Sequence, residues 1–114
     1  MKFAAYIRTA TQNPASVEKQ RTEIAQWIIT QNGDLVETYI DESSSGRNQE
    51  RPALHQMQAD AAQGRFEAVV VTDLHRLSRN QTELDAIRSR LQIGSVEAYS
   101  IEELATTPVA QATK

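Results

Sequence analysis

Apolar residues along this sequence fall into two alternating patterns, short continuous runs and longer stretches in which they recur every three or four positions. The continuous runs predict β-strands at residues 2–7, 35–40, 66–71 and 96–101. The periodic stretches predict helices between them, at residues 13–32, 52–64 and 80–91. The run Ala68-Val69-Val70-Val71 is continuous and mostly β-branched, which is typical of a strand buried on both faces.

Turn-forming residues mark the ends of the predicted helices. Asn13 and Pro14 are residue types preferred at a helix N-cap and first turn. Gly33, Gly64 and Gly94 follow the last periodic residues, where a glycine commonly ends a helix. The resulting order of strands and helices predicts an α/β fold, with a mainly parallel central sheet of four to five strands and helices on both faces.

The composition narrows the classes of protein that remain. A chain of 114 residues with 39% hydrophobic residues fits one domain with its own core. The sequence contains no Cys, which excludes thiol catalysis, iron–sulfur clusters and disulfides. With His55 and His75 as its two histidines, we expect no metal or other cofactor. No apolar run approaches the ~20 residues of a membrane span and no signal peptide is evident, so we expect a cytoplasmic protein.

The arginines are distributed unevenly along the chain. The net charge is −3, from 12 basic and 15 acidic residues, which argues against binding nucleic acid by bulk charge alone. In a parallel sheet the functional site lies at the carboxyl ends of the strands, which here are the segments 8–12, 41–51 and 72–79. Those segments contain Arg8, Arg47, Arg51, Arg76 and Arg79. Converging guanidinium groups suit an anion with several oxygens, above all phosphate, whereas the alternative is a set of unrelated, solvated surface arginines.

Several motifs at these strand ends resemble the serine recombinases, the family of resolvases, invertases and integrases. They are Tyr6-Ile7-Arg8-Thr9-Ala10-Thr11, Gln20, Tyr39-Ile40-Asp41-Glu42 followed by Gly46, Glu50-Arg51-Pro52-Ala53-Leu54, and Leu74-His75-Arg76-Leu77-Ser78-Arg79-Asn80. The resemblance extends from residue 1 to about residue 107. It implies a resolvase-like three-layer fold, with residues 1–107 as a catalytic domain.

The resemblance also implies a chemistry and a set of site residues. In that family a Ser hydroxyl attacks a DNA phosphodiester, which leaves a phosphoserine link and a free 3′ hydroxyl, and the strands are rejoined after subunit rotation. Preorganised arginines would stabilise the charge on the phosphoryl oxygens without a metal. The resemblance assigns active-site positions to Arg8, Arg51, Arg76 and Arg79, and supporting positions to Gln20, Asp41 and His75.

Two residues depart from the family pattern within the site. Ala10 occupies the position of the nucleophile, and a methyl group cannot attack phosphorus. Thr9 and Thr11 flank it, but neighbours on an extended segment point elsewhere. His75 replaces the Asp of the Leu-Asp-Arg signature, so a constant anion gives way to a group that is neutral or cationic near neutral pH. We therefore expect a domain that does not cleave DNA.

A third departure is length. The sequence ends at Lys114, soon after Thr107-Pro108, where family members continue into a long dimerisation helix and then a DNA-binding domain. We interpret residues 108–114 as a tail at the start of a missing dimerisation helix, and we expect a monomer or weak dimer. The expected partner is DNA or an intact recombinase, with duplex binding weaker than the ~10⁻⁴–10⁻⁶ M that is usual for non-specific binding.

Two classes of function remain open at this point. The first is a recombinase homologue that is inactive in strand cleavage, as a regulator of recombination, a relic or a fragment of a larger recombinase. The second is a receiver or flavodoxin-like signalling domain or a nucleotide-binding module, in which Asp73 after the third strand would accept a phosphoryl group. A receiver, however, needs acidic residues after its first strand, where this chain has Arg8, and no Gly-rich phosphate loop is present.

Overall fold

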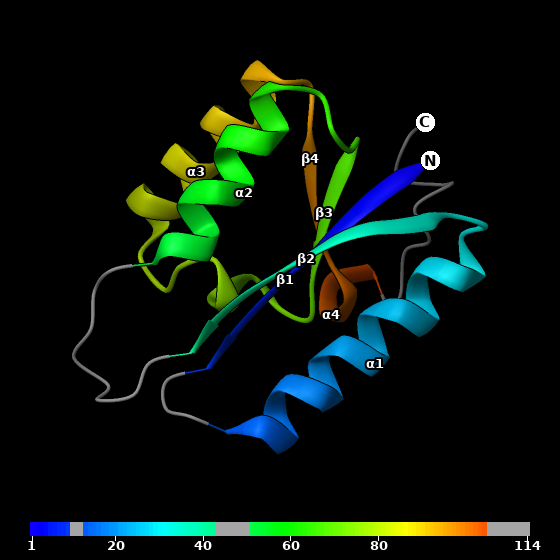
Figure 1. Ribbon diagram of the computed structural model, residues 1–114. Coiled ribbons are helices and arrows are strands. Elements are labelled where there is room, and N and C mark those ends of the chain that lie inside the picture. The colour runs from blue at the N-terminus through cyan, green and yellow to red at the C-terminus, as the bar shows by residue number, and fades with distance from the viewer. Residues whose placement is uncertain (10–12, 43–50, 105–114) are drawn as a thin grey trace.

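The computed structural model describes residues 1–9, 13–42 and 51–104 (Figure 1). Its strands and helices follow one another in near-perfect alternation. They are β1 (Lys2–Thr9), α1 (Pro14–Thr30), β2 (Asp34–Glu42), α2 (Pro52–Ala62), β3 (Ala68–Val71), the 3₁₀ helix η1 (Leu74–Arg76), α3 (Gln81–Ile93), β4 (Glu97–Ser100) and α4 (Ile101–Leu104). None of the helices in these ranges combines the length and apolarity needed to cross a membrane.

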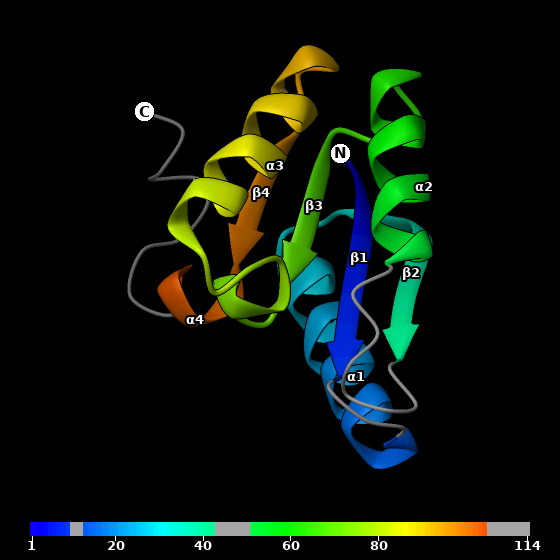
Figure 2. The ribbon, with the colours of Figure 1, turned by 90° about the vertical axis from the view of Figure 1, so that its left-hand side faces the viewer.

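The four strands form one sheet in the order β2-β1-β3-β4, and every neighbouring pair is parallel. The prediction of an α/β fold with a parallel sheet is therefore confirmed. In Figure 2 the arrowheads of the strands point the same way, so their carboxyl ends share one edge of the sheet. The register places Arg8 of β1 beside Asp41 of β2 at that edge.

Helices cover both faces of the sheet, with α1 on one side and α2 and α3 on the other (Figure 1). The alternation of side chains along β1 divides the core between the two faces. On the α1 face, β1 contributes Phe3, Ala5 and Ile7 to the buried cluster. On the α2/α3 face, it contributes Ala4 and Tyr6. All five are buried, so β1 is covered on both faces from Phe3 to Ile7.

The predicted helix starts at Asn13 and Asn80 are confirmed. The Asn13 side-chain oxygen accepts a hydrogen bond from the Ser16 backbone amide at 3.1 Å, and that of Asn80 accepts one from the Glu83 amide at 2.9 Å. Each bond satisfies an amide that the first turn of the helix leaves without a partner. The N-terminus of α2 differs, because Arg51 precedes it and contributes no side-chain cap.

Most element boundaries differ by one or two residues from the sequence prediction, and the differences around β3 and β4 bear on the site. Strand β3 begins at Ala68 rather than at Phe66, although the Phe66 side chain is buried and packs against the ring of Tyr39. An apolar run indicates burial, and it does not distinguish a buried connection from a strand. The segment 72–79 contains η1, and the last strand ends at Ser100 with α4 directly after it.

Candidate functional site

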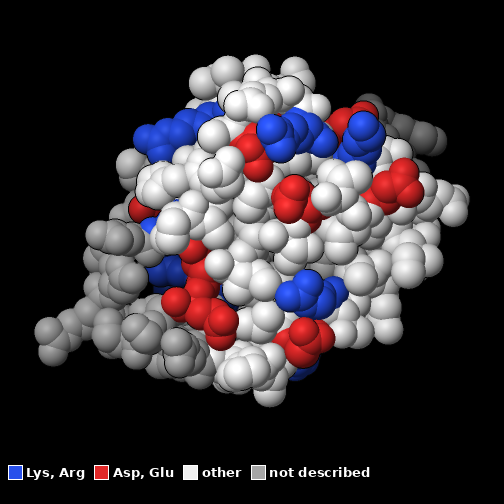
Figure 3. Space-filling model, viewed as in Figure 1, with Lys and Arg blue, Asp and Glu red and all other residues white. Residues whose placement is uncertain are grey.

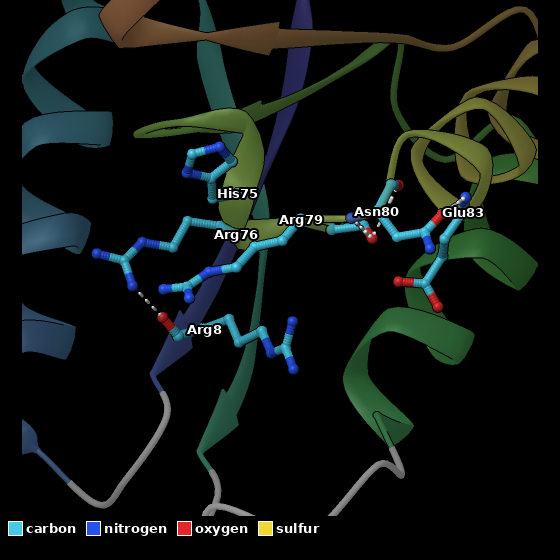
Figure 4. Close-up of a pocket in the computed structure, with 7 residues that line it drawn as sticks. Arg8, His75, Arg76, Arg79, Asn80 and Glu83 are labelled. Atoms are coloured by element: carbon cyan, nitrogen blue, oxygen red, sulfur yellow. Dashed lines mark hydrogen bonds between the residues drawn. The ribbon is translucent and has the colours of Figure 1, made fainter.

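An open cavity of about 390 Å³ lies at the carboxyl edge of the sheet. Its lining residues come from the end of β1, from the segment around η1 and from the start of α3. They are Arg8, His75, Arg76, Ser78, Arg79, Asn80 and Glu83 (Figure 4). The fold thus brings three of the four predicted active-site arginines to one cavity, although β1 and η1 are more than sixty residues apart in the sequence.

Arg76 and Gln20 both bind the backbone at the end of β1. Arg76 donates from Nη1 to the carbonyl oxygen of Arg8 at 3.1 Å, and Gln20 donates from Nε2 to the same oxygen at 3.2 Å. Gln20 lies on α1 and is buried. Arg76 also lies 3.4 Å from a carboxylate oxygen of Asp73, measured from its Nε. Two side chains therefore fix the backbone just before position 10.

Arg51, to which the resemblance assigns an active-site position, is buried in the interior of the domain. Arg51 is 7% exposed. Its Nη2 donates to the Tyr6 hydroxyl at 3.0 Å and to the Arg76 carbonyl at 2.9 Å. The guanidinium also lies 5.5 Å from the centre of the Tyr6 ring. Another of its nitrogens, Nη1, lies 3.7 Å from a carboxylate oxygen of Glu83, which lines the cavity. Arg51 is thus a buried cation behind the cavity.

Asp41 connects this buried arginine to the start of α2. The Tyr6 hydroxyl donates to one of its carboxylate oxygens at 2.7 Å. The two oxygens also accept the backbone amides of Ala53 at 2.9 Å and Leu54 at 3.0 Å. Asp41 therefore serves as the N-terminal cap that Arg51 does not supply, and its negative charge suits the positive end of the helix dipole. Burial, and then the bond to Asp41, raise the pKa of the Tyr6 phenol well above its ordinary value, so it stays neutral.

Two arginines of the cavity keep their side chains available. Within residues 1–9, 13–42 and 51–104, the guanidinium groups of Arg8 and Arg79 make no hydrogen bond or ion pair. Figure 4 shows the Arg79 side chain extending toward the space above Arg8, while Arg76 turns toward α1. His75 is exposed at the rim. These groups can form charge-assisted hydrogen bonds with an oxyanion that enters the cavity.

One face of the molecule shows no concentration of positive charge. On the face viewed in Figure 3, basic and acidic side chains are interspersed rather than gathered into one patch. This agrees with the net charge of −3. Over the part of the chain that is described, no group of three or more His, Asp or Glu residues is arranged to hold a metal ion. The positive charge at the site comes from the arginines that line the cavity.

A comparison with protein families identifies the origin of this arrangement. The sequence matches the family model described as "Resolvase, N terminal domain" over residues 3–113. The chain belongs to the resolvase family. The match favours the recombinase-like class over the receiver and nucleotide-binding alternatives, and a comparison with curated proteins found no match.

Solved structures show the same fold as this resolvase-family chain. The N-terminal catalytic domain of TP901-1 integrase matches with a TM-score of 0.78 at 24% identity, over 94% of this chain and 85% of that one. A resolvase family site-specific recombinase from Streptococcus pneumoniae matches with a TM-score of 0.79 at 20% identity, over 99% and 82%. The C-terminal catalytic domain of ISC1926 TnpA, an IS607-like serine recombinase, matches with a TM-score of 0.79 at 19% identity, over 89% and 67%.

Some positions singled out in this resolvase-family sequence lie outside the described residues. They are Ala10, Thr11, Gly46, Arg47 and the tail 108–114. Conversely, sequence reasoning missed the buried role of Tyr6 and the two carboxylates that pair with site arginines, Asp73 and Glu83. The position of Glu83 in the first turn of α3, next to the Arg79-Asn80 segment, was a signal that could have found it.

Proposed function

We propose that this chain is a serine-recombinase catalytic-domain homologue that binds phosphate groups of DNA in its arginine cavity and does not cleave them. The observation that carries the proposal is the cavity itself, which Arg8, Arg76 and Arg79 line at the carboxyl edge of the sheet. In the sequence, Ala10 follows directly after the strand that carries Arg8, at the position where the family has its nucleophilic Ser. A site with cations but no nucleophile can bind a phosphodiester and cannot open it.

The neighbouring hydroxyl groups are poor substitutes for the missing Ser. Thr9 is only 4% exposed, so its hydroxyl has little access to a phosphodiester that approaches from solvent. Thr11 is two positions further along and lies outside the described residues. A nucleophile must reach the phosphorus in line with the leaving oxygen and lose its proton to a base. The proposal therefore assigns no covalent step to this chain.

The exchange of Asp for His75 supports anion binding in the absence of cleavage. His75 lines the cavity with the arginines, so a neutral or protonated imidazole is present where the resemblance leads us to expect a carboxylate. Removing a negative charge from the rim makes the cavity more favourable to phosphate. Arg8, Arg51, Arg76 and Arg79 are the residues to which we assign binding or support of that phosphate, with Gln20 and Asp41 as positioning residues.

The biological role we propose is regulatory. A domain that keeps the family fold and the arginine cavity can occupy a DNA backbone or associate with an intact recombinase without contributing cleavage. The net charge of −3 disfavours tight binding to duplex DNA, since non-specific affinity grows with the number of phosphates that are neutralised. We therefore expect duplex binding to be weak and strongly dependent on salt.

The test of the proposal joins a binding measurement to a trapping measurement. Inorganic sulfate or phosphate should shift the NMR signals of Arg8, Arg76 and Arg79 during a titration in low salt. Nicked duplexes that trap phosphoserine intermediates of active recombinases should give no adduct that survives denaturation. An active serine recombinase provides the positive control for trapping. A stable adduct mapped to Thr9 or Thr11 would contradict the loss of cleavage, and an absence of anion binding would contradict the phosphate site.

A further inference from the structure

Glu83 is a carboxylate within the arginine cavity. It lies in the first turn of α3, where its backbone amide donates a hydrogen bond to the side-chain oxygen of Asn80 at 2.9 Å. Its side chain is 57% exposed, and Figure 4 shows the carboxylate turned into the cavity. Its oxygen Oε1 is 3.7 Å from Nη1 of Arg51, whose own side chain is 8% exposed. A negative charge thus lies beside the space that an oxyanion would occupy.

We propose that Glu83 determines specificity at this site, by favouring singly charged phosphodiesters over doubly charged phosphate groups. The inference rests on the proposed phosphate-binding function, which it deepens. A phosphodiester in DNA carries one negative charge, whereas a terminal phosphate or a phosphorylated side chain carries nearly two at neutral pH. The carboxylate repels both, and it repels the doubly charged group more.

Among its described lining residues, the cavity has few positive charges that are not already paired, so the repulsion from Glu83 has a large effect on the affinity for anions. Arg76 has Asp73 beside it, at 3.4 Å, and Arg51 has Glu83. Among the described residues, Arg8 and Arg79 are therefore the lining arginines whose charge is not already offset by a carboxylate within 4.0 Å. The two positive charges of Arg8 and Arg79 can neutralise a ligand with one or two negative charges. The Glu83 carboxylate beside them therefore alters the relative affinity for the two kinds of ligand.

Arg51 cannot relieve the repulsion by moving with the ligand. Its other nitrogens donate to the Tyr6 hydroxyl and to the Arg76 carbonyl, and it is buried. Arg51 therefore stays beside Glu83 when a ligand enters, and it does not approach the ligand to offset the repulsion from the carboxylate. Coulomb energy is proportional to the charge of the ligand, so the penalty from Glu83 in free energy doubles from a monoanion to a dianion.

The experiment compares two oxyanions of similar size, dimethyl phosphate with one charge and sulfate with two. Their dissociation constants are measured by NMR titration at low, constant ionic strength for the unchanged protein and for Glu83→Gln. The matched control is Asp85→Asn, which removes the same charge from the exposed face of the same helix, away from the cavity lining. The backbone cap by Asn80 is kept in Glu83→Gln, because only the amide of residue 83 takes part in it.

If Glu83→Gln strengthens dimethyl phosphate binding about threefold, it should strengthen sulfate binding about tenfold, since the factor for the dianion is the square of that for the monoanion. Asp85→Asn should change both by less than about twofold, because exposed charges outside the cavity are screened. Equal factors for the two anions, or equal effects of the two variants, would overturn the inference and leave the phosphate site intact. Failure of both anions to bind either protein would overturn the phosphate site and the inference together.

Glu83→Ala separates the loss of charge from any new hydrogen bond made by the Gln amide. The inference expects Glu83→Ala to change the ratio of the two dissociation constants in the same direction as Glu83→Gln. An unchanged ratio in Glu83→Ala would assign the effect to the amide and overturn the specificity role. The melting temperature of each variant, measured in the same buffer, shows whether the fold is kept.

Discussion

Arg51 binds the phenol oxygen of Tyr6 with two nitrogens, Nη2 at 3.0 Å and Nε at 3.3 Å. The phenol in turn donates to Asp41 at 2.7 Å, and Asp41 caps α2. One neutral hydroxyl therefore joins a buried cation to a buried anion. Because both charged groups have hydrogen-bond partners, their removal from water is compensated in the folded state. Arg51 also donates to the carbonyl oxygen of Arg76, so this buried network connects Tyr6 of β1 to a residue that lines the cavity.

Replacing the phenol tests that link. Tyr6→Phe removes the acceptor for Arg51 and the donor to Asp41 while it keeps the ring in the core. We expect the free energy of unfolding to fall by about 1–3 kcal/mol, because two buried charged groups lose a partner. Urea denaturation at neutral pH measures the change.

The matched control is Tyr99→Phe. Tyr99 is half-buried against Trp27, and its hydroxyl has no hydrogen-bond partner among the described residues. That variant should change the free energy of unfolding by less than about 0.5 kcal/mol, as is usual away from such networks. Similar losses in the two variants would show that the Tyr6 hydroxyl contributes no more to the free energy of unfolding than the hydroxyl of Tyr99, which has no hydrogen-bond partner among the described residues.

Arg79 offers a direct test of anion binding. Its side chain is exposed and lines the cavity, and no described residue forms an ion pair with it. Arg79→Ala should weaken sulfate binding about three- to tenfold, since a charge-assisted contact in a partly solvated site is lost. The free energy of unfolding should stay nearly unchanged, because the side chain packs against little in the folded state.

Arg90→Ala is the control for Arg79→Ala, because Arg90 is an exposed arginine on α3 that does not line the cavity. It removes the same charge from the domain and should leave sulfate binding within about twofold of the unchanged protein, because distant exposed charges are screened. Equal weakening by both substitutions would attribute anion binding to overall charge rather than to this cavity.

Much of the fold could be predicted because the apolar pattern follows the strands and helices closely. The continuous apolar character of Val69 and Val70 reflects a strand covered on both faces, and the fold places β3 between β1 and β4. The boundaries were harder to predict. Phe66 is buried like a strand residue but precedes β3, because a sequence pattern records burial and not backbone hydrogen bonding.

The candidate site could be predicted at the level of its segments but not of its contacts. The carboxyl-edge rule located Arg8, Arg76 and Arg79, since a parallel topology brings those strand ends together. It did not reveal that Arg51 is buried, because that depends on a pairing with Tyr6 across 45 residues of sequence. The pairing of Glu83 with Arg51 was likewise hidden, because Glu83 belongs to no motif of the resemblance and lies 32 positions after Arg51 in the sequence.

The end of α3 approaches α2 so closely that only a glycine fits. A Cβ on Gly94 would collide with the backbone carbonyl of Ala61. Gly94→Ala should therefore lower the free energy of unfolding by about 2–3 kcal/mol, because the two helices must separate. Thermal or urea unfolding measures the loss.

Gly64→Ala provides the comparison for Gly94→Ala. Gly64 has a φ of 74°, and the space around its Cβ position is open. Its substitution strains the backbone without a collision, which costs about 1 kcal/mol. A loss for Gly94→Ala no larger than that for Gly64→Ala would contradict the close approach of α3 to α2.

The hydrogen bonds of the Asp60 carboxylate make the free energy of unfolding depend on pH in the acid range. One of its carboxylate oxygens accepts a hydrogen bond from the Tyr39 hydroxyl at 2.5 Å, and the other accepts one from Gln56 at 2.9 Å. The bond from Tyr39, followed by that from Gln56 and the charge of Arg65, lowers the pKa of Asp60 below its ordinary value against the opposing effect of burial. The ionised carboxylate is thus favoured in the folded state.

A lowered pKa in the folded state stabilises the fold above the pKa of the unfolded chain, about 3.9 for Asp. That contribution is fully present at neutral pH and is lost as the pH falls through the lower pKa of the folded state. Asp60→Asn should therefore be less stable than the unchanged protein at pH 7, and the difference should shrink as the pH falls below about 4. Urea midpoints collected between neutral and acid pH measure both curves, and Asp85→Asn, on an exposed helix face, serves as the control. Curves for Asp60→Asn and the unchanged protein that stay parallel over the whole range would show that Asp60 contributes nothing to the acid sensitivity.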